Sequence, residues 1–172
     1  MWVDEEGLHL ALRREGGQWL AVEISTELPP DALHVEVELA TALDELDPQA
    51  VSAVFVYRDD EHEADIEFSR WGVRGPVPNA QFAVAPYGPG ELHRFRLGGD
   101  LAPSTHVLDW RADRVAFHSS QGGRVIEEWR HTDPAWEARD GYRLIINLWL
   151  YQGRRPAFGR PMEIIYSAIR VD

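Results

Sequence analysis

Residues 63–68 alternate strictly between acidic and apolar side chains. The acids are Glu63, Asp65 and Glu67. The apolar residues between and after them are Ala64, Ile66 and Phe68. A repeat of two residues is typical of a strand with one buried face, because successive side chains point to opposite sides of a sheet. The pattern therefore predicts a strand over 62–68 that buries its apolar face and presents three carboxyl groups together on the other.

Three carboxylates on one strand face have a chemical consequence. Like charges that lie close together raise the pKa of at least one member, so the group tends to keep a proton near neutral pH. A protonated acid beside an ionised carboxylate is the pair that glycoside hydrolysis requires. The outer Cα atoms of such a strand lie about 13 Å apart, yet glutamate side chains leaning together on a concave face can approach the ~5–5.5 Å of a retaining pair. The alternative is a solvated strand face with scattered charge.

The rest of the chain is a series of short apolar segments separated by turn residues. Strands are predicted at 7–12, 18–25, 33–39, 51–57, 62–68, 79–85, 92–97, 105–110, 114–119, 124–130, 142–150 and 162–171. Gly16 and Gly17 are expected to turn the first two into a hairpin, and the acidic link at 41–49 has room for a short helical turn. About a dozen short strands at regular spacing predict an all-β sandwich of two antiparallel sheets. We expect residues 1–172 to form a single domain.

Charge and composition exclude several classes of partner. The chain has 29 acidic and 17 basic side chains, a formal net charge of −12. A field of this sign repels phosphate backbones and anionic lipids, so we expect no nucleic-acid and no membrane partner. Cysteine is absent, which excludes disulfides and thiolate metal sites. The first six residues lack the basic and apolar regions of a signal peptide, so none is expected in this chain.

The acidic stretch resembles the signature of the family 16 glycoside hydrolases, the laminarinase, lichenase and xyloglucan-transferase group. The family pattern is Glu-x-Asp-x-Glu with an aliphatic residue commonly at the first x, where this chain has Ala64. Three more segments follow in the order that the family would place them. Residues 79–82 resemble the strand paired with the catalytic one, 105–110 the His-x-x-x-x-Trp segment, and 146–149 the Asn-x-Trp strand of the sugar cleft.

The resemblance implies a curved jelly roll with a concave glycan cleft, and cleavage of a β-glucan with net retention. By match to the motif, Glu63 would be the nucleophile and Glu67 the general acid/base, while Asp65 would hold Glu63 by a hydrogen bond. Family members usually have additional residues before the segment that matches Gly7, and these supply a strand near the C-terminal one. We therefore expect the strand at 162–171 to be an under-protected edge, unless residues 1–4 replace that neighbour.

Five further residues are candidates for contact with the substrate: Trp71, Gln81, His106, Asn147 and Trp149. Asn147 and Trp149 share one face of a predicted strand, so they can offer a hydrogen bond beside a stacking plane, although Trp149 could instead be a core indole. Trp71 could flank the cleft or fill the sandwich. His106 could donate to a sugar hydroxyl, although a lone histidine is more often a structural hydrogen-bonding group.

The loop predicted at 153–161 contains three arginines. Arg154 and Arg155 could bind an anionic sugar; the alternative is a solvated loop. The seven histidines share no spacing typical of metal-ligand pairs, so we expect no metal and no cofactor.

Two hypotheses follow. The first is an endo-acting, retaining glycosidase that cleaves a β-linked polysaccharide, and the second is a non-catalytic, lectin-like sandwich that has kept the cleft. Fold alone does not decide between them, and the intact acidic triplet favours the enzyme. We expect a polysaccharide or oligosaccharide as substrate and a monomeric chain. The resemblance suggests a secreted protein, while the compartment, the sugar and the linkage stay open.

Overall fold

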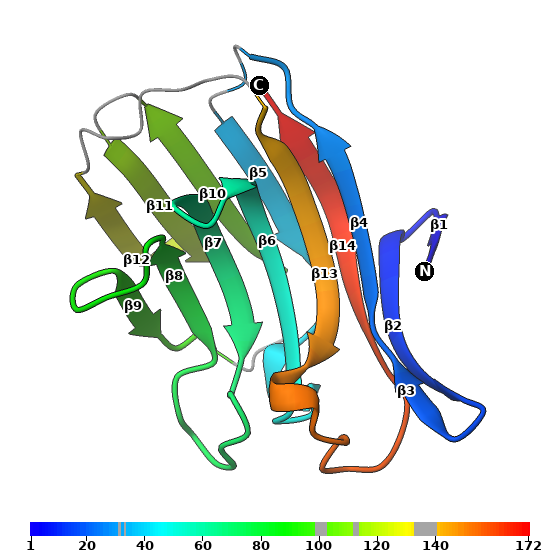
Figure 1. Cartoon of the computed structure of the whole chain (residues 1–172). Helices are drawn as coiled ribbons and strands as arrows, with labels where there is room; N and C mark the ends of the chain where they lie inside the picture. Colours follow the sequence, from blue (N-terminus) through cyan, green and yellow to red (C-terminus); the bar gives the residue numbers. More distant parts are fainter. Residues whose placement is uncertain (31, 33, 99–102, 112–113, 133–140) are drawn as a thin grey trace.

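Two antiparallel β-sheets pack face to face in the computed structural model of the chain (Figure 1). The structure describes all residues except 31, 33, 99–102, 112–113 and 133–140, so the first position of the strand predicted at 33–39 lies outside the described residues. The eight-stranded sheet contains, in spatial order, β1 (Trp2–Asp4), β2 (Gly7–Glu15), β14 (Met162–Val171), β5 (His34–Leu39), β10 (Ser104–Arg111), β11 (Arg114–Gln121) and β12 (Arg124–His131), with β3 (Gln18–Leu20) paired to β2. The six-stranded sheet contains β4 (Val22–Glu27), β13 (Arg143–Leu150), β6 (Ala50–Asp59), β7 (His62–Ser69), β8 (Ala80–Val84) and β9 (Leu92–Phe95).

The helical elements of the described residues are two short 3-10 turns, η1 (Leu43–Glu45) and η2 (Tyr151–Gly153). The first lies within 41–49, where the sequence predicts a helical turn. No helix in the described part of the chain is long and apolar enough to cross a membrane. The prediction of an all-β, two-sheet antiparallel jelly-roll sandwich is confirmed.

The acidic strand β7 lies inside the six-stranded sheet, between β6 and β8 (Figure 1). Its apolar residues Ala64, Ile66 and Phe68 are at most 1% exposed and belong to the main core between the sheets. Because side chains alternate along a strand, the three acids point away from that core. The predicted orientation of β7 is therefore confirmed.

The hairpin predicted around Gly16 and Gly17 forms only in part. β3 pairs with the end of β2, but the chain then leaves that sheet, and β4 pairs with β13 in the other sheet. The prediction of one continuous strand over 18–25 is thus wrong. A tight turn fixes pairing only next to itself, and the longer pairing of β4 with β13 takes over beyond it.

β14 is not the bare edge that the resemblance led us to expect. It pairs with β2 through residues 162–166 and with β5 through residues 166–171. The close approach of β2 requires glycine at position 7, because a Cβ atom there would lie 2.2 Å from the carbonyl oxygen of Tyr166. The neighbour of β14 is therefore β2, and β1 covers the opposite side of β2.

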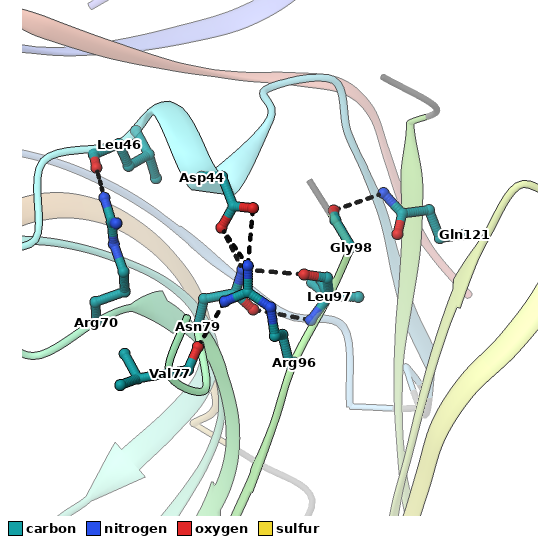
Figure 2. A network of polar contacts seen from close by, with 9 residues as sticks. All are labelled: Asp44, Leu46, Arg70, Val77, Asn79, Arg96, Leu97, Gly98 and Gln121. Carbon is teal, nitrogen blue, oxygen red and sulfur yellow. Dashed lines mark hydrogen bonds and ion pairs between the residues drawn. The ribbon is translucent and has the colours of Figure 1, made fainter. Parts of the chain in front are cut away.

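Residues next to the ends of β7, β8 and β9 form polar contacts with one another and with the segment 41–49, which contains η1 (Figure 2). Asn79 forms two hydrogen bonds with the backbone of Leu97, at 2.8 and 3.1 Å. Arg96 pairs with Asp44 of η1 at 2.9 Å, and Arg70 donates to the carbonyl of Leu46. These bonds fix the chain where it leaves the acidic strand, where it enters β8 and where it leaves β9.

Candidate active site

The register of the sheet identifies which side chains share the outer face with the acids, because directly paired residues project to the same side. The row through Glu67 runs across five strands and contains Asn147, Ala53, Glu67, Gln81 and Arg94. The row through Asp65 contains Ile145, Phe55, Asp65, Ala83 and Leu92. The acids thus lie on a sheet face that also presents amides, an arginine and a small apolar cluster of Ala53, Phe55 and Ile145. The concave cleft itself stays a prediction.

Asp65 is the most deeply buried of the three acids, with 5% of its surface exposed. The hydroxyl of Tyr87 donates to its Oδ2 atom at 2.6 Å. Burial raises the pKa of Asp65 well above its ordinary value, and the charges of Glu63 and Glu67 raise it further. Both effects favour the protonated form of Asp65, which is able to donate a hydrogen bond.

Glu63 lies two residues before Asp65 on β7 and is half-buried. Burial raises the pKa of Glu63, and hydrogen bonds from Tyr87 and Asp65 oppose that rise. A protonated Asp65 that donates to Glu63 stabilises the ionised form of Glu63.

The pKa of Glu67 is raised by the same main cause. Burial is the main cause that raises the pKa of Glu67, to about 7, and the charge of Glu63 adds to it. The charge of Arg94 and hydrogen bonds from Gln81 and Trp71 lower this pKa. We expected the like charges on the strand face to be the main cause, so the raised pKa is confirmed but its principal cause is desolvation.

A chain of polar contacts fixes the carboxyl group of Glu67. Arg94 Nε donates to Gln81 Oε1 at 2.8 Å, and Gln81 Nε2 donates to Glu67 Oε2 at 2.6 Å. Because Arg94 has no acceptor, it orients the Gln81 amide with its NH₂ group toward Glu67. The guanidinium of Arg94 also lies 4.2 Å from the ring centre of Trp71. Two predicted substrate-binding residues, Trp71 and Gln81, are therefore brought next to Glu67.

The backbone at Trp71 is unusual for a bulky residue. Its φ is 44°, in the left-handed region. The Trp71 amide donates to Ser69 Oγ at 2.8 Å, and the Gly72 amide donates to the Pro48 carbonyl at 2.7 Å. A strained conformation held in this way beside a group of acids is typical of a functional site.

Asn147 and Trp149 lie on β13, two strands from β7. Asn147 is in register with Ala53, and its Oδ1 accepts a hydrogen bond from the Ala53 amide at 3.2 Å. Trp149 is half-buried and, as predicted, shares the outer face with Asn147. It lines a surface hollow of about 550 Å³ together with Trp19.

His106 does not reach this face. Its ring is fully buried in the sandwich, with its nitrogens 2.7 and 2.8 Å from the hydroxyls of Ser119 and Ser104. It packs against Phe68 at a ring-centre distance of 4.6 Å, and burial lowers the pKa of His106 to about 3. The expectation that His106 contacts substrate is wrong. Its side chain points from β10 into the core between the sheets, where its role is structural.

Sequence reasoning missed Tyr87 and Arg94. Tyr87 lies in the loop after β8 and is 53% exposed, so no periodic pattern marks it. Arg94 lies on the edge strand β9, and only its register opposite Gln81 connects it to Glu67. Arg94 could have been identified only from the pairing of β8 with β9.

One group of side chains has donors close enough to hold a cation. Single donor atoms of Asp4, Glu6 and His9 lie within 4.8 Å of one another. The nitrogens of His9 are already 2.9 Å from Asp4 Oδ1 and 2.5 Å from Glu163 Oε1. This group lies on β1, β2 and the turn between them, in the other sheet from the acidic strand, and it has no role in the proposed reaction.

Comparison with known proteins gives the fold a context. No family model matches the sequence, and no curated protein matches it. Among solved structures, the Crh5 transglycosylase aligns with a TM-score of 0.69 and 17% identity, over 97% of this chain and 72% of that one. A laminarinase from Flavobacterium sp. UMI-01 aligns with a TM-score of 0.68 and 15% identity, over 95% and 77%.

A Bacteroides ovatus family 16 enzyme, solved with a mixed-linkage glucan product, has a TM-score of 0.65 and 11% identity, over 95% of this chain and 79% of that one. At such low identity the agreement is one of fold. The chain has the fold of the family 16 glycoside hydrolases.

Proposed function

We propose that this chain is a retaining, endo-acting glycoside hydrolase of β-linked polysaccharides. Glu63 is the nucleophile, Glu67 the general acid/base, and Asp65 the residue that holds Glu63 and carries the shared proton. The observation that carries the proposal is the grouping of three carboxyl groups with different hydrogen-bond partners on one strand face. Burial raises the pKa of Glu67 to about 7; burial also raises the pKa of Glu63, but hydrogen bonds from Tyr87 and Asp65 oppose that rise.

The first step of a retaining reaction requires an ionised Glu63 and a protonated Glu67. The Glu63 carboxylate attacks the anomeric carbon, and Glu67 gives its proton to the leaving oxygen as the glycosidic bond breaks. Glu67, now ionised, takes a proton from water as the water attacks the covalent glycosyl-enzyme and releases Glu63. Two successive displacements at one carbon restore the original configuration.

The surroundings of the acids suit a polysaccharide. The row through Glu67 extends from Arg94 on one side to Asn147 on the other, so a sugar chain can cross the face with amides on both sides of the cleaved bond. Trp71 and Trp149 offer aromatic surface at the ends of this path. The fold shared with a laminarinase and a transglycosylase supports the same class of substrate.

A substrate panel tests the proposal. Laminarin, lichenan, xyloglucan, agarose and carrageenan are incubated with the wild-type chain and with Glu63→Gln, and new reducing ends are measured. We expect release from at least one β-linked polymer, and a loss of roughly 10⁴-fold in the variant. Binding without release from any polymer would contradict the hydrolase and favour the lectin-like alternative.

A further inference from the structure

A second feature of the outer face lies where β13 ends. Residues of β3, β13 and the loop after β13 line the surface hollow of about 550 Å³. They include Trp19 and Trp149, which are both half-buried, together with Gln18 and Arg155. We call this the Trp19–Trp149 hollow. None of these four residues contacts the acids of β7 through a hydrogen bond or ion pair.

The hollow is within reach of a sugar chain bound at Glu67. Trp149 shares its face with Asn147, and Asn147 is in register with Ala53 and Glu67. One two-residue step along a strand and two steps between strands separate Trp149 from Glu67, which is roughly 12 Å. An oligosaccharide of a few units therefore extends from the acids into the hollow.

Arg155 is an available cation in a strongly acidic protein. The chain has 29 acidic side chains against 17 basic ones, and Arg96 and Arg170 pair with Asp44 and Glu36. Arg155 forms no ion pair with any described residue. Its planar group has five N–H donors, which match the geometry of a carboxylate or a sulfate.

The loop that holds Arg155 is anchored. The carboxylate of Asp47, 2% exposed, accepts hydrogen bonds from the amides of Ala157 at 2.9 Å and Phe158 at 2.6 Å. At the start of the loop, the Tyr151 amide donates to the Gln49 carbonyl at 2.8 Å. Arg155 lies between these two anchors, so its backbone is held beside the indoles before any ligand binds, which reduces the entropy cost of binding.

We propose that the Trp19–Trp149 hollow binds an anionic sugar unit of the substrate, one that bears a sulfate ester or a uronate. The apolar face of the pyranose packs on the indoles, and the anionic group pairs with Arg155. The proposal rests on the proposed function for the path of the sugar chain. Because the net charge of the protein repels polyanions, selection for a charged unit requires a local cation, and Arg155 supplies it.

Binding of matched oligosaccharides tests this inference. Calorimetric titrations use the Glu63→Gln chain with two pairs: a sulfated oligosaccharide with its desulfated form, and a uronate oligosaccharide with its carboxyl-reduced form. We expect the charged member of one pair to bind more tightly, and that pair identifies the anionic group. Adding Arg155→Gln should weaken its binding about tenfold, the value of one charge-assisted hydrogen bond, and leave the neutral form within about twofold.

Two further variants separate the site from general charge. Arg160→Gln removes a cation from the same loop, where it lies 5.8 Å from the ring centre of Phe158 and outside the hollow, and should leave both pairs unchanged. Arg155→Lys keeps the charge and should retain part of the preference. Equal binding of charged and neutral forms, or equal losses in Arg155→Gln and Arg160→Gln, would overturn the inference.

The failure of this inference is distinguishable from the failure of the proposed function. A wild-type chain that cleaves a neutral glucan and shows no charge preference retains the hydrolase and overturns the anionic subsite. A chain that binds a charged oligosaccharide through Arg155 and cleaves nothing supports the subsite and overturns the hydrolase.

Discussion

Tyr87 and Arg94 act on different acids of β7. Tyr87 donates to Asp65 and favours the ionised form of Glu63. Arg94 orients Gln81, and its charge lowers the pKa of Glu67. We expect the activity to have a bell-shaped dependence on pH. Its acid limb should be set by Glu63, and its basic limb, near pH 7, by Glu67.

Replacing Tyr87 by phenylalanine removes one donor and keeps the ring. The pKa of Glu63 should rise, so the acid limb should move to higher pH, and kcat/KM on the acid side should fall roughly tenfold. Tyr57→Phe is the matched control, since the Tyr57 hydroxyl bonds to Asp60 outside the triplet. An unchanged acid limb in Tyr87→Phe would separate Tyr87 from the nucleophile.

Replacing Arg94 by glutamine tests the other limb. Without this cation the ionised form of Glu67 is less stable, so its pKa should rise above about 7, and the basic limb should move to higher pH. Arg94→Lys keeps the charge and should give a smaller shift. A basic limb that moves to lower pH in Arg94→Gln would contradict the assignment of Glu67 as the general acid.

At the scale of strands, β14 has two different environments. Residues 162–166 pair with β2 and include the buried Ile164 and Tyr166, whereas residues 168–171 pair with β5 and are more exposed. Hydrogen exchange should therefore be slow in the first half, comparable to β13, and faster in the second. Uniformly fast exchange along β14 would mean that β2 is not its stable neighbour.

Local pattern predicted most strand positions and the orientation of β7, because alternation reports which side chains share a face. It did not predict that β4 changes sheet or that β2 covers β14, because both depend on pairing between distant segments. The same limit explains His106: alternation along β10 shows two faces, but packing of the sheets decides which is inside. Tyr87 lies in a loop, where no alternation exists.

At the scale of the whole molecule, the sandwich buries one face of the six-stranded sheet, and the other face points away from the main core. The core holds Ala64, Ile66 and Phe68 at nearly zero exposure, so the backbone of the acidic strand is rigid. The fold is shared with enzymes at 11–17% identity, which shows how little of the sequence the sandwich itself requires. Function therefore has to be argued from the outer face.

Direct attack of Glu63 on the sugar is testable by proton NMR of the first product from a β-linked substrate, with spectra recorded before mutarotation mixes the anomers. We expect a β-anomer, because a covalent intermediate on Glu63 and a second displacement by water retain the configuration. An α-anomer as the first product would show a single displacement by water and would remove Glu63 from the role of nucleophile.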